Sequence, residues 1–172
     1  MTGLPPPDEP PPTPRAGTEK ELLEAQLDDK RTILLRKCAG LSEEDLRQAP
    51  TVSTLSLLGI LKHTAYTHRW WFRTVFGGED LSFAWADGDP EFDLRPEPDE
   101  TAEGIAALFR DECVRARAIV AASDLDELAR GTHPRVKDIN LRGVMLHMLQ
   151  EMSRHLGQAD IIRETIDGST GD

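Results

Sequence analysis

The sequence predicts an all-α protein, a four-helix bundle with long connections. Apolar residues recur at steps of three and four in four long segments, which is the period of an amphipathic helix. No segment shows the polar and apolar alternation of a β-strand. The chain has 172 residues, of which 38% are hydrophobic, and this is enough for one core and one domain.

The first 17 residues are expected to be a disordered tail. Seven of the 12 prolines fall in residues 5–14, where their rings favour extended backbone and remove hydrogen-bond donors. We expect this tail to bury no apolar side chain. The bundle domain is expected to span residues 18–168, and residues 169–172 are expected to be a flexible C-terminus.

The first helix is predicted from Thr18 to about Ala39. The run Thr18-Glu19-Lys20-Glu21 has the form of a capping box, and Gly40 ends the helix. Its apolar stripe is expected to face the core, with Asp28, Asp29 and Arg31 facing water. A short helical turn follows Ser42 and closes at Pro50.

A second helix is predicted from about Thr54 to Phe76, with Ser53 or Thr54 as its cap and the Gly77-Gly78 pair as its end. Lys62, Arg69 and Arg73 define its expected solvent-facing stripe. His63 and His68 fall on opposite flanks of its broad apolar arc. Trp70 and Trp71 are interpreted as core and rim packing that would also wall a pocket.

Residues 79–99 form a long acidic connection, with eight acidic residues and one arginine. Prolines exclude a regular element there. Because the segment also carries Phe83, Trp85 and Phe92, we expect it to fold back on the bundle as a lid or interface. Two further helices are predicted, over 102–122 and from the Asn140 cap to about Ile166.

Composition and charge exclude several classes of function. The formal net charge is −11, which repels nucleic acid and anionic membrane surfaces. No apolar run is long enough to span a membrane, and a cytoplasmic protein is expected. Cys38 and Cys113 lie far apart in helical segments, so they are interpreted as free thiols in a reducing compartment.

The last helix carries the strongest candidate chemistry, in the run HMLQEMSRH. His147, Glu151 and His155 are each four residues from the next and so lie on adjoining parts of one face. His155 falls inside the apolar arc, Glu151 at its edge and His147 outside it. A carboxylate beside a histidine at the border of the core is costly without a positive partner, and a divalent cation would supply one.

Two alternatives remain open on spacing alone. A Glu and a His four residues apart are also a common helical ion pair. On the second helix, spacing does not choose between His63 and His68 as a further ligand. Two histidines and one carboxylate would make a set known from catalytic zinc sites, with positions left for water or substrate.

Three stretches give the sequence a resemblance to a known family: KCAGLSEEDLRQAP, TLSLLGILKHTAYTHRWWF and LRGVMLHMLQEMSRHLGQADIIRETIDG. They resemble the DinB-like (YfiT-like) metal-binding four-helix bundles, and among these the actinobacterial branch related to mycothiol S-transferases. The resemblance covers about residues 20–168. The pattern of this family has a helix-two histidine before a tryptophan, matched by His63 with Trp71, and an acid four residues before a histidine on helix four.

The resemblance implies a divalent metal, zinc or nickel, held by His63, Glu151 and His155. It also implies a transferase that activates a low-molecular-weight thiol such as mycothiol as a metal-bound thiolate against a small electrophile. The chain departs from the pattern at His68, where the branch has Glu, and at Gln158, where it often has His. These departures concern the residues that surround the metal ligands and those that line the substrate pocket. The candidates for these two roles are His68, His147, Gln158, Trp70 and Trp71.

Two functions from different classes are therefore carried forward. The first is a metal-dependent thiol transferase whose partners are a small thiol and an electrophile, as a monomer or a homodimer. The second is a non-catalytic helical binding module with a structural or vacant metal site. A fourth protein ligand, from His68 or His147, would favour the second, because structural zinc sites normally fill four positions.

Overall fold

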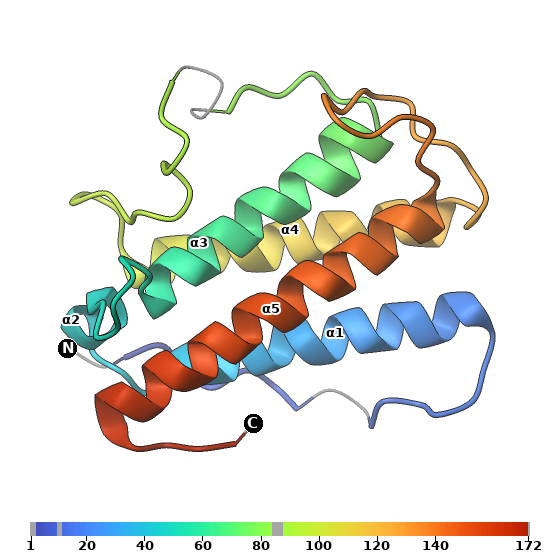
Figure 1. Cartoon of the computed structure of the whole chain (residues 1–172). Coiled ribbons are helices and arrows are strands. Elements are labelled where there is room, and N and C mark those ends of the chain that lie inside the picture. Colours follow the sequence, from blue (N-terminus) through green and yellow to red (C-terminus); the bar gives the residue numbers. More distant parts are fainter. Residues whose placement is uncertain (1–2, 10–11, 84–87, 172) are drawn as a thin grey trace.

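The computed structural model describes residues 3–9, 12–83 and 88–171, and Figure 1 shows their helical architecture. The elements in chain order are α1 Glu19–Cys38, α2 Glu43–Arg47, α3 Leu57–His68, the π-helix η1 Arg69–Phe76, α4 Ala102–Ala122 and α5 Leu141–Asp167. The described ranges contain no strand, only an isolated bridge between Leu128 and Asn140. The prediction of an all-α bundle is confirmed.

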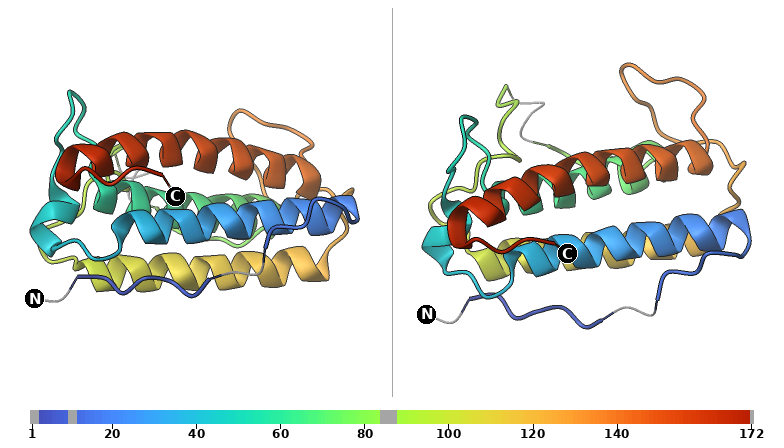
Figure 2. Two further views of the ribbon diagram at one scale, coloured as in Figure 1. Left: turned by 90° about the horizontal axis from the view of Figure 1, so that it is seen from below. Right: turned by 60° about the horizontal axis from the view of Figure 1, so that its bottom comes forward.

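The four long helices form two pairs of neighbours, α1 with α5 and α3 with α4 (Figures 1 and 2). Within each pair the helices run in the same direction. The starts of α1 and α5 are joined by an ion pair between Glu19 and Arg142 at 2.7 Å. The amide of Ala102 at the start of α4 donates to Glu43 of α2 at 2.9 Å, close to where α3 begins. The long connection from η1 to α4 must therefore travel back along the whole bundle.

Local signals fix the helix ends. Thr18 and Glu21 form the expected capping box of α1. Asn140 caps α5 through Gly143, and Gly168 ends α5 in the left-handed conformation that suits glycine. The second helix differs at its start, because Ser56 rather than Ser53 or Thr54 accepts the amide of Gly59 at 3.0 Å.

The last two turns of the second helix are wider than expected. The amide of Gly77 bonds to the carbonyl of Phe72, five residues earlier, at 3.0 Å, and Arg69–Phe76 form a π-helix. Segments of this kind are rare and often lie at functional sites. This one carries Trp70 and Trp71.

Two expected solvent-facing side chains are buried, and these expectations were wrong. Lys62 is 0% exposed and Arg31 is 4% exposed. The ammonium of Lys62 bonds to the carbonyl of Arg95 at 2.9 Å, and the guanidinium of Arg31 bonds to His68 at 3.0 Å. Helical periodicity placed both on a polar face, but in each case another segment supplies polar partners that cover the charge.

The N-terminal segment follows the outside of the bundle (Figure 2). It differs from the expectation at Leu4, which is 6% exposed and whose carbonyl accepts the amide of Gly40 at 2.9 Å. At the other end of the chain, the carbonyl of Gly171 accepts a hydrogen bond from Lys37.

The acidic connection folds back on the bundle, as its aromatic residues predicted. Phe83 is buried, with its ring 5.1 Å from that of Trp70. Phe92 meets Tyr66 edge-on at 5.3 Å. Trp85 lies outside the described residues. Among the helices that the structure describes, none has the length and apolar character needed to cross a membrane.

Candidate metal centre

Three side chains from two helices converge between α3 and α5: His63 from α3, and Glu151 and His155 from α5. One ligand atom of each lies within 4.8 Å of the others. The rings of His63 and His155 meet edge-on with centroids 4.7 Å apart. We call these three residues the site triad. Because Glu151 and His155 are one helical turn apart, α5 alone brings two of them together.

His63 is oriented by a carboxylate from the acidic connection. Its Nδ1 lies 2.8 Å from Oδ2 of Asp93, a buried residue. A carboxylate only accepts, so Nδ1 carries the hydrogen and Nε2 presents a lone pair. The hydroxyl of Thr67 lies 3.4 Å from this Nε2, but it donates to the backbone carbonyl of His63 at 2.7 Å.

His155 is oriented in the same way by an amide. Its Nδ1 lies 2.8 Å from Oε1 of Gln158, so this nitrogen donates and Nε2 again presents a lone pair. Nε2 lies 3.6 Å from Oε2 of Glu151, which is too long for a hydrogen bond. Burial, followed by the electrostatic effect of the neighbouring His63, lowers the pKa of His155.

The arrangement fits a divalent cation. Two imidazoles and a carboxylate each bring a ligand atom within 4.8 Å of the others, and Nδ1 of each ring is held by a protein acceptor. Three electron-rich atoms so close together repel one another unless a positive charge lies between them. Histidine ligands of metals are typically held in this way by an outer carboxylate or carbonyl.

A pocket of about 460 Å³ opens beside the site triad. Trp70 and Trp71 of η1 form one wall, and Asp93 and Leu94 of the acidic connection form another. The remaining residues that line it are His63, Thr67, Pro90, His133, Pro134, Arg135, His147 and Glu151. A pocket of this size, with two tryptophans and several polar and charged side chains in its lining, suits a small molecule.

Two histidines flank the indole of Trp71 in this pocket. The ring of His133 stacks on it at 4.8 Å and an interplanar angle of 18°, and the ring of His147 lies 4.2 Å away on a tilted plane. Burial lowers the pKa of both imidazoles. Nδ1 of His133 accepts the amide of Arg135 at 3.0 Å, whereas within the described residues neither ring nitrogen of His147 has a hydrogen-bond partner.

The structure separates the two histidines that spacing on helix two left open. His63 joins the site triad. His68 is 1% exposed and lies in the core, where Nδ1 donates to the carbonyl of Thr64 at 2.8 Å and Nε2 accepts from Arg31 at 3.0 Å. His68 therefore does not surround the site triad, whereas Gln158 bonds a member of it and Trp70, Trp71 and His147 line the pocket.

Sequence reasoning missed two residues of the site. Asp93 bonds to His63 from 30 positions along the chain, and His133 reaches the pocket from the connection before α5. The acidic, aromatic composition of residues 79–99 signalled a segment that folds back. It did not signal which of eight carboxylates would meet the histidine.

Comparisons with known proteins agree with this fold. A family model described as Mycothiol-S-transferase matches residues 22–168, most of the chain. The chain belongs to the mycothiol-S-transferase family of DinB-like helical bundles. Membership supports a mycothiol S-transferase-like function at the level of the family. It also fits the possible histidine and glutamate metal site formed by the site triad.

A solved structure of a conserved protein from Enterococcus faecalis is similar, with a TM-score of 0.58 and 15% sequence identity. The match covers 90% of this chain and 100% of that one, and at this identity it supports the fold alone. A search of the curated proteins found no match.

Proposed function

We propose that this protein is a metal-dependent thiol S-transferase that joins a mycothiol-like thiol to a small electrophile. His63, Glu151 and His155 would hold one divalent metal, zinc or nickel. The observation that carries the proposal is the convergence of their ligand atoms within 4.8 Å, with Nδ1 of both histidines already bonded to Asp93 and Gln158.

Three protein ligands suit a catalytic centre better than a structural one, because structural zinc sites normally have four. When bound, the divalent ion supplies a positive charge that lowers the pKa of a thiol reaching it, so that the thiol loses its proton near neutral pH. The role of the chain is to hold the ligand atoms in place, to shape the pocket and to keep water from the reacting groups.

The sulfur that reacts must come from a substrate. Burial raises the pKa of Cys38 to about 12 and that of Cys113 to about 11. Both thiols therefore stay protonated at neutral pH, and both are covered by the core. Since thiolates rather than thiols are nucleophiles, neither cysteine of the chain is suited to attack an electrophile.

The pocket indicates where the electrophile would bind. Trp70, Trp71 and Pro134 offer apolar surface beside the site triad. His147 lines the same space, and because neither of its ring nitrogens has a partner among the described residues, both could bond to a bound substrate. We expect mycothiol to be preferred to glutathione, because glutathione carries two carboxylates and the chain is strongly acidic.

The test is a conjugation assay with a haloarene or a halogenated bimane as electrophile, in which the thiol sulfur displaces halide and the thiol proton passes to the solvent. Metal-loaded protein should transfer mycothiol, and chelator-treated protein should not. Glu151→Gln should lose at least about 100-fold in rate, since it removes a charged ligand. Glu164→Gln is the matched control, the same change at an exposed position of the same helix, and it should retain full activity.

Failure with every thiol would overturn the transferase proposal. If metal-loaded protein is inactive with mycothiol, bacillithiol, glutathione and cysteine alike, the alternative of a non-catalytic binding module takes its place. Metal retained without activity would then mark the site as structural. Protein that binds no metal would mark it as vacant.

A further inference from the structure

We propose that Lys62 is a positioning residue of the metal centre, which fixes residues 92–100 on α3 and thereby holds Asp93 against His63. The inference rests on the proposed metal site, since it concerns how one of its ligands is oriented. Lys62 precedes His63 in sequence, yet its side chain lies in contact with a segment 30 or more positions away.

The buried ammonium of Lys62 joins two points of this segment. It donates to the carbonyl of Arg95 at 2.9 Å and to Oε2 of Glu100 at 2.8 Å, and it lies 4.0 Å from the centre of the Phe92 ring. At 0% exposure, an ammonium without such partners would be strongly destabilising. The charge is therefore stable in this position only while residues 92–100 cover it.

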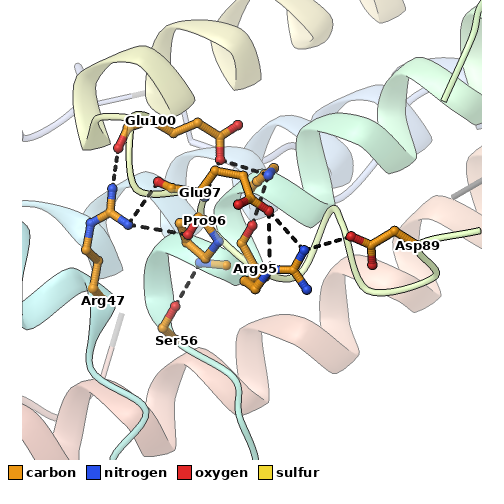
Figure 3. A network of polar contacts seen from close by, with 9 residues as sticks. Arg47, Ser56, Asp89, Arg95, Pro96, Glu97 and Glu100 are labelled. Carbon is orange, nitrogen blue, oxygen red and sulfur yellow. Dashed lines mark hydrogen bonds and ion pairs between the residues drawn. The ribbon is translucent and has the colours of Figure 1, made fainter. Parts of the chain in front are cut away.

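The same segment is attached to α2 and to itself, as Figure 3 shows. Arg47 of α2 donates to the carbonyls of Pro96 and Glu97 at 3.5 and 3.3 Å, and also to that of Glu100. The amide of Glu97 bonds to Oε2 of Glu100 at 2.7 Å, the oxygen that also binds Lys62. One carboxylate therefore links the ammonium to the backbone of the segment.

Close packing against α3 limits how the segment can move. A Cβ atom added at Gly59, one turn before His63, would lie 2.2 Å from the carbonyl oxygen of Leu94. Only glycine allows the backbone to approach α3 so closely at this point. Asp93 lies between Phe92 and Leu94, both of which contact α3 or its side chains, so its carboxylate has little freedom to leave Nδ1 of His63.

The consequence is a chain of contacts from a buried cation to a metal ligand. If Lys62 no longer holds Arg95 and Glu100, Asp93 loses its fixed position, and the ring of His63 can turn or shift its hydrogen to Nε2. Changes to the outer partners of a metal ligand typically weaken metal binding by about 10- to 100-fold. We expect a loss of this size in Lys62→Met.

The matched control is Lys37→Met, which removes a second buried ammonium. Lys37 is 5% exposed and pairs with Asp160 at 2.7 Å, and its ammonium has no hydrogen bond or ion pair with the described residues 92–100. A second variant, Gly59→Ala, pushes the segment away from α3 while keeping every charge. It therefore tests the same idea if Lys62→Met folds poorly.

The experiment has one measurement without metal and one with it. In the metal-free protein, hydrogen exchange of residues 92–100 should accelerate in Lys62→Met and Gly59→Ala but not in Lys37→Met, and the NMR signal of the His63 Nδ1 proton should broaden or vanish. In chelator competition, the two site variants should bind zinc about 10- to 100-fold more weakly than wild type. Lys37→Met should bind as wild type does.

Two results would overturn the inference: unchanged exchange of residues 92–100 in Lys62→Met, or faster exchange with unchanged zinc affinity. Wild-type protein that binds neither zinc nor nickel would instead defeat the proposed function. The positioning role is then decided by the metal-free measurements. It stands if the His63 proton signal is lost in Lys62→Met and falls if the signal persists.

Discussion

His63 and His68 lie on the same helix, five residues apart, but the two regions around them differ in how many ring nitrogens they supply with a hydrogen-bond partner. In the core, both nitrogens of His68 have protein partners, the Thr64 carbonyl and the Arg31 guanidinium. At the pocket, only Nδ1 of His63 has a strong partner, Asp93, and the ring lies beside Glu151 and His155. A histidine that the protein satisfies completely is structural, whereas one left with a lone pair among other acceptors is suited to bind a cation.

The two regions also differ in how they are stabilised. The Arg31–His68 pair is buried between aromatic rings, with His68 5.7 Å from Phe109. The site triad is half-buried at a pocket. Replacements in the first region should therefore change stability and leave metal binding intact, and replacements in the second should do the reverse.

The largest expected effect is on metal content. His155→Ala should abolish stoichiometric binding of zinc or nickel, because it removes one of three ligands. His133→Ala, in the same pocket but outside the site triad, should retain it. Elemental analysis of the purified variants measures both, and equal metal content in the two would contradict the assignment.

Stability should respond most to His68. In metal-free protein, His68→Ala is expected to lower the free energy of unfolding by about 3 kcal/mol, because it leaves a cavity and a buried guanidinium without its acceptor. His155→Ala should cost less than about 1 kcal/mol under the same conditions, since it also relieves the repulsion among the ligand atoms of the site triad. Urea titrations measure the free energy of unfolding of both variants. A larger loss in His155→Ala than in His68→Ala would contradict the expectation that the core histidine contributes more to stability.

A smaller effect is expected from deletion of residues 1–16. Leu4 is buried against the bundle, and its loss should cost about 2 kcal/mol, which lowers the melting temperature of a chain of this size by about 6 °C. Metal content should not change, because the segment does not line the pocket. An unchanged melting temperature would show that Leu4 contributes nothing in solution.

The smallest expected effect is a dependence of the free energy of unfolding on pH, which arises from His68 in the core. Burial and the adjacent Arg31 hold the pKa of His68 well below its ordinary value, whereas in the unfolded chain it is about 6.5. Below pH 6.5 the unfolded chain therefore binds one more proton than the folded protein. As the pH is lowered below 6.5, the free energy of unfolding should therefore decrease, and this group contributes at most about 1.4 kcal/mol per pH unit to that decrease.

His68→Gln should remove this contribution and flatten the decline between pH 6.5 and 5, measured by urea unfolding in chelator. His133→Gln serves as the control, because His133 is more exposed and should contribute less. Identical slopes in wild type and His68→Gln would mean that His68 accepts its proton without unfolding.

Much of the bundle was determined by the sequence alone, because helices depend on neighbours three and four residues away. Thr18, Asn140 and Gly168 mark helix ends by local hydrogen bonds and backbone preference. Glu151 and His155 meet because one turn of helix separates them. For the same reason, the sequence could place this pair at the border of the core.

What the tertiary structure decided is which residues meet across long connections. His63 and His68 fall on opposite flanks of the apolar arc of their helix, and only the packing of α1 and α5 around α3 assigns one to the core and the other to the pocket. Asp93 reaches His63, and Lys62 becomes buried, because residues 88–101 pack against α3 on their way to the start of α4. No periodicity encodes that path, since it depends on the summed contacts of a segment without regular structure.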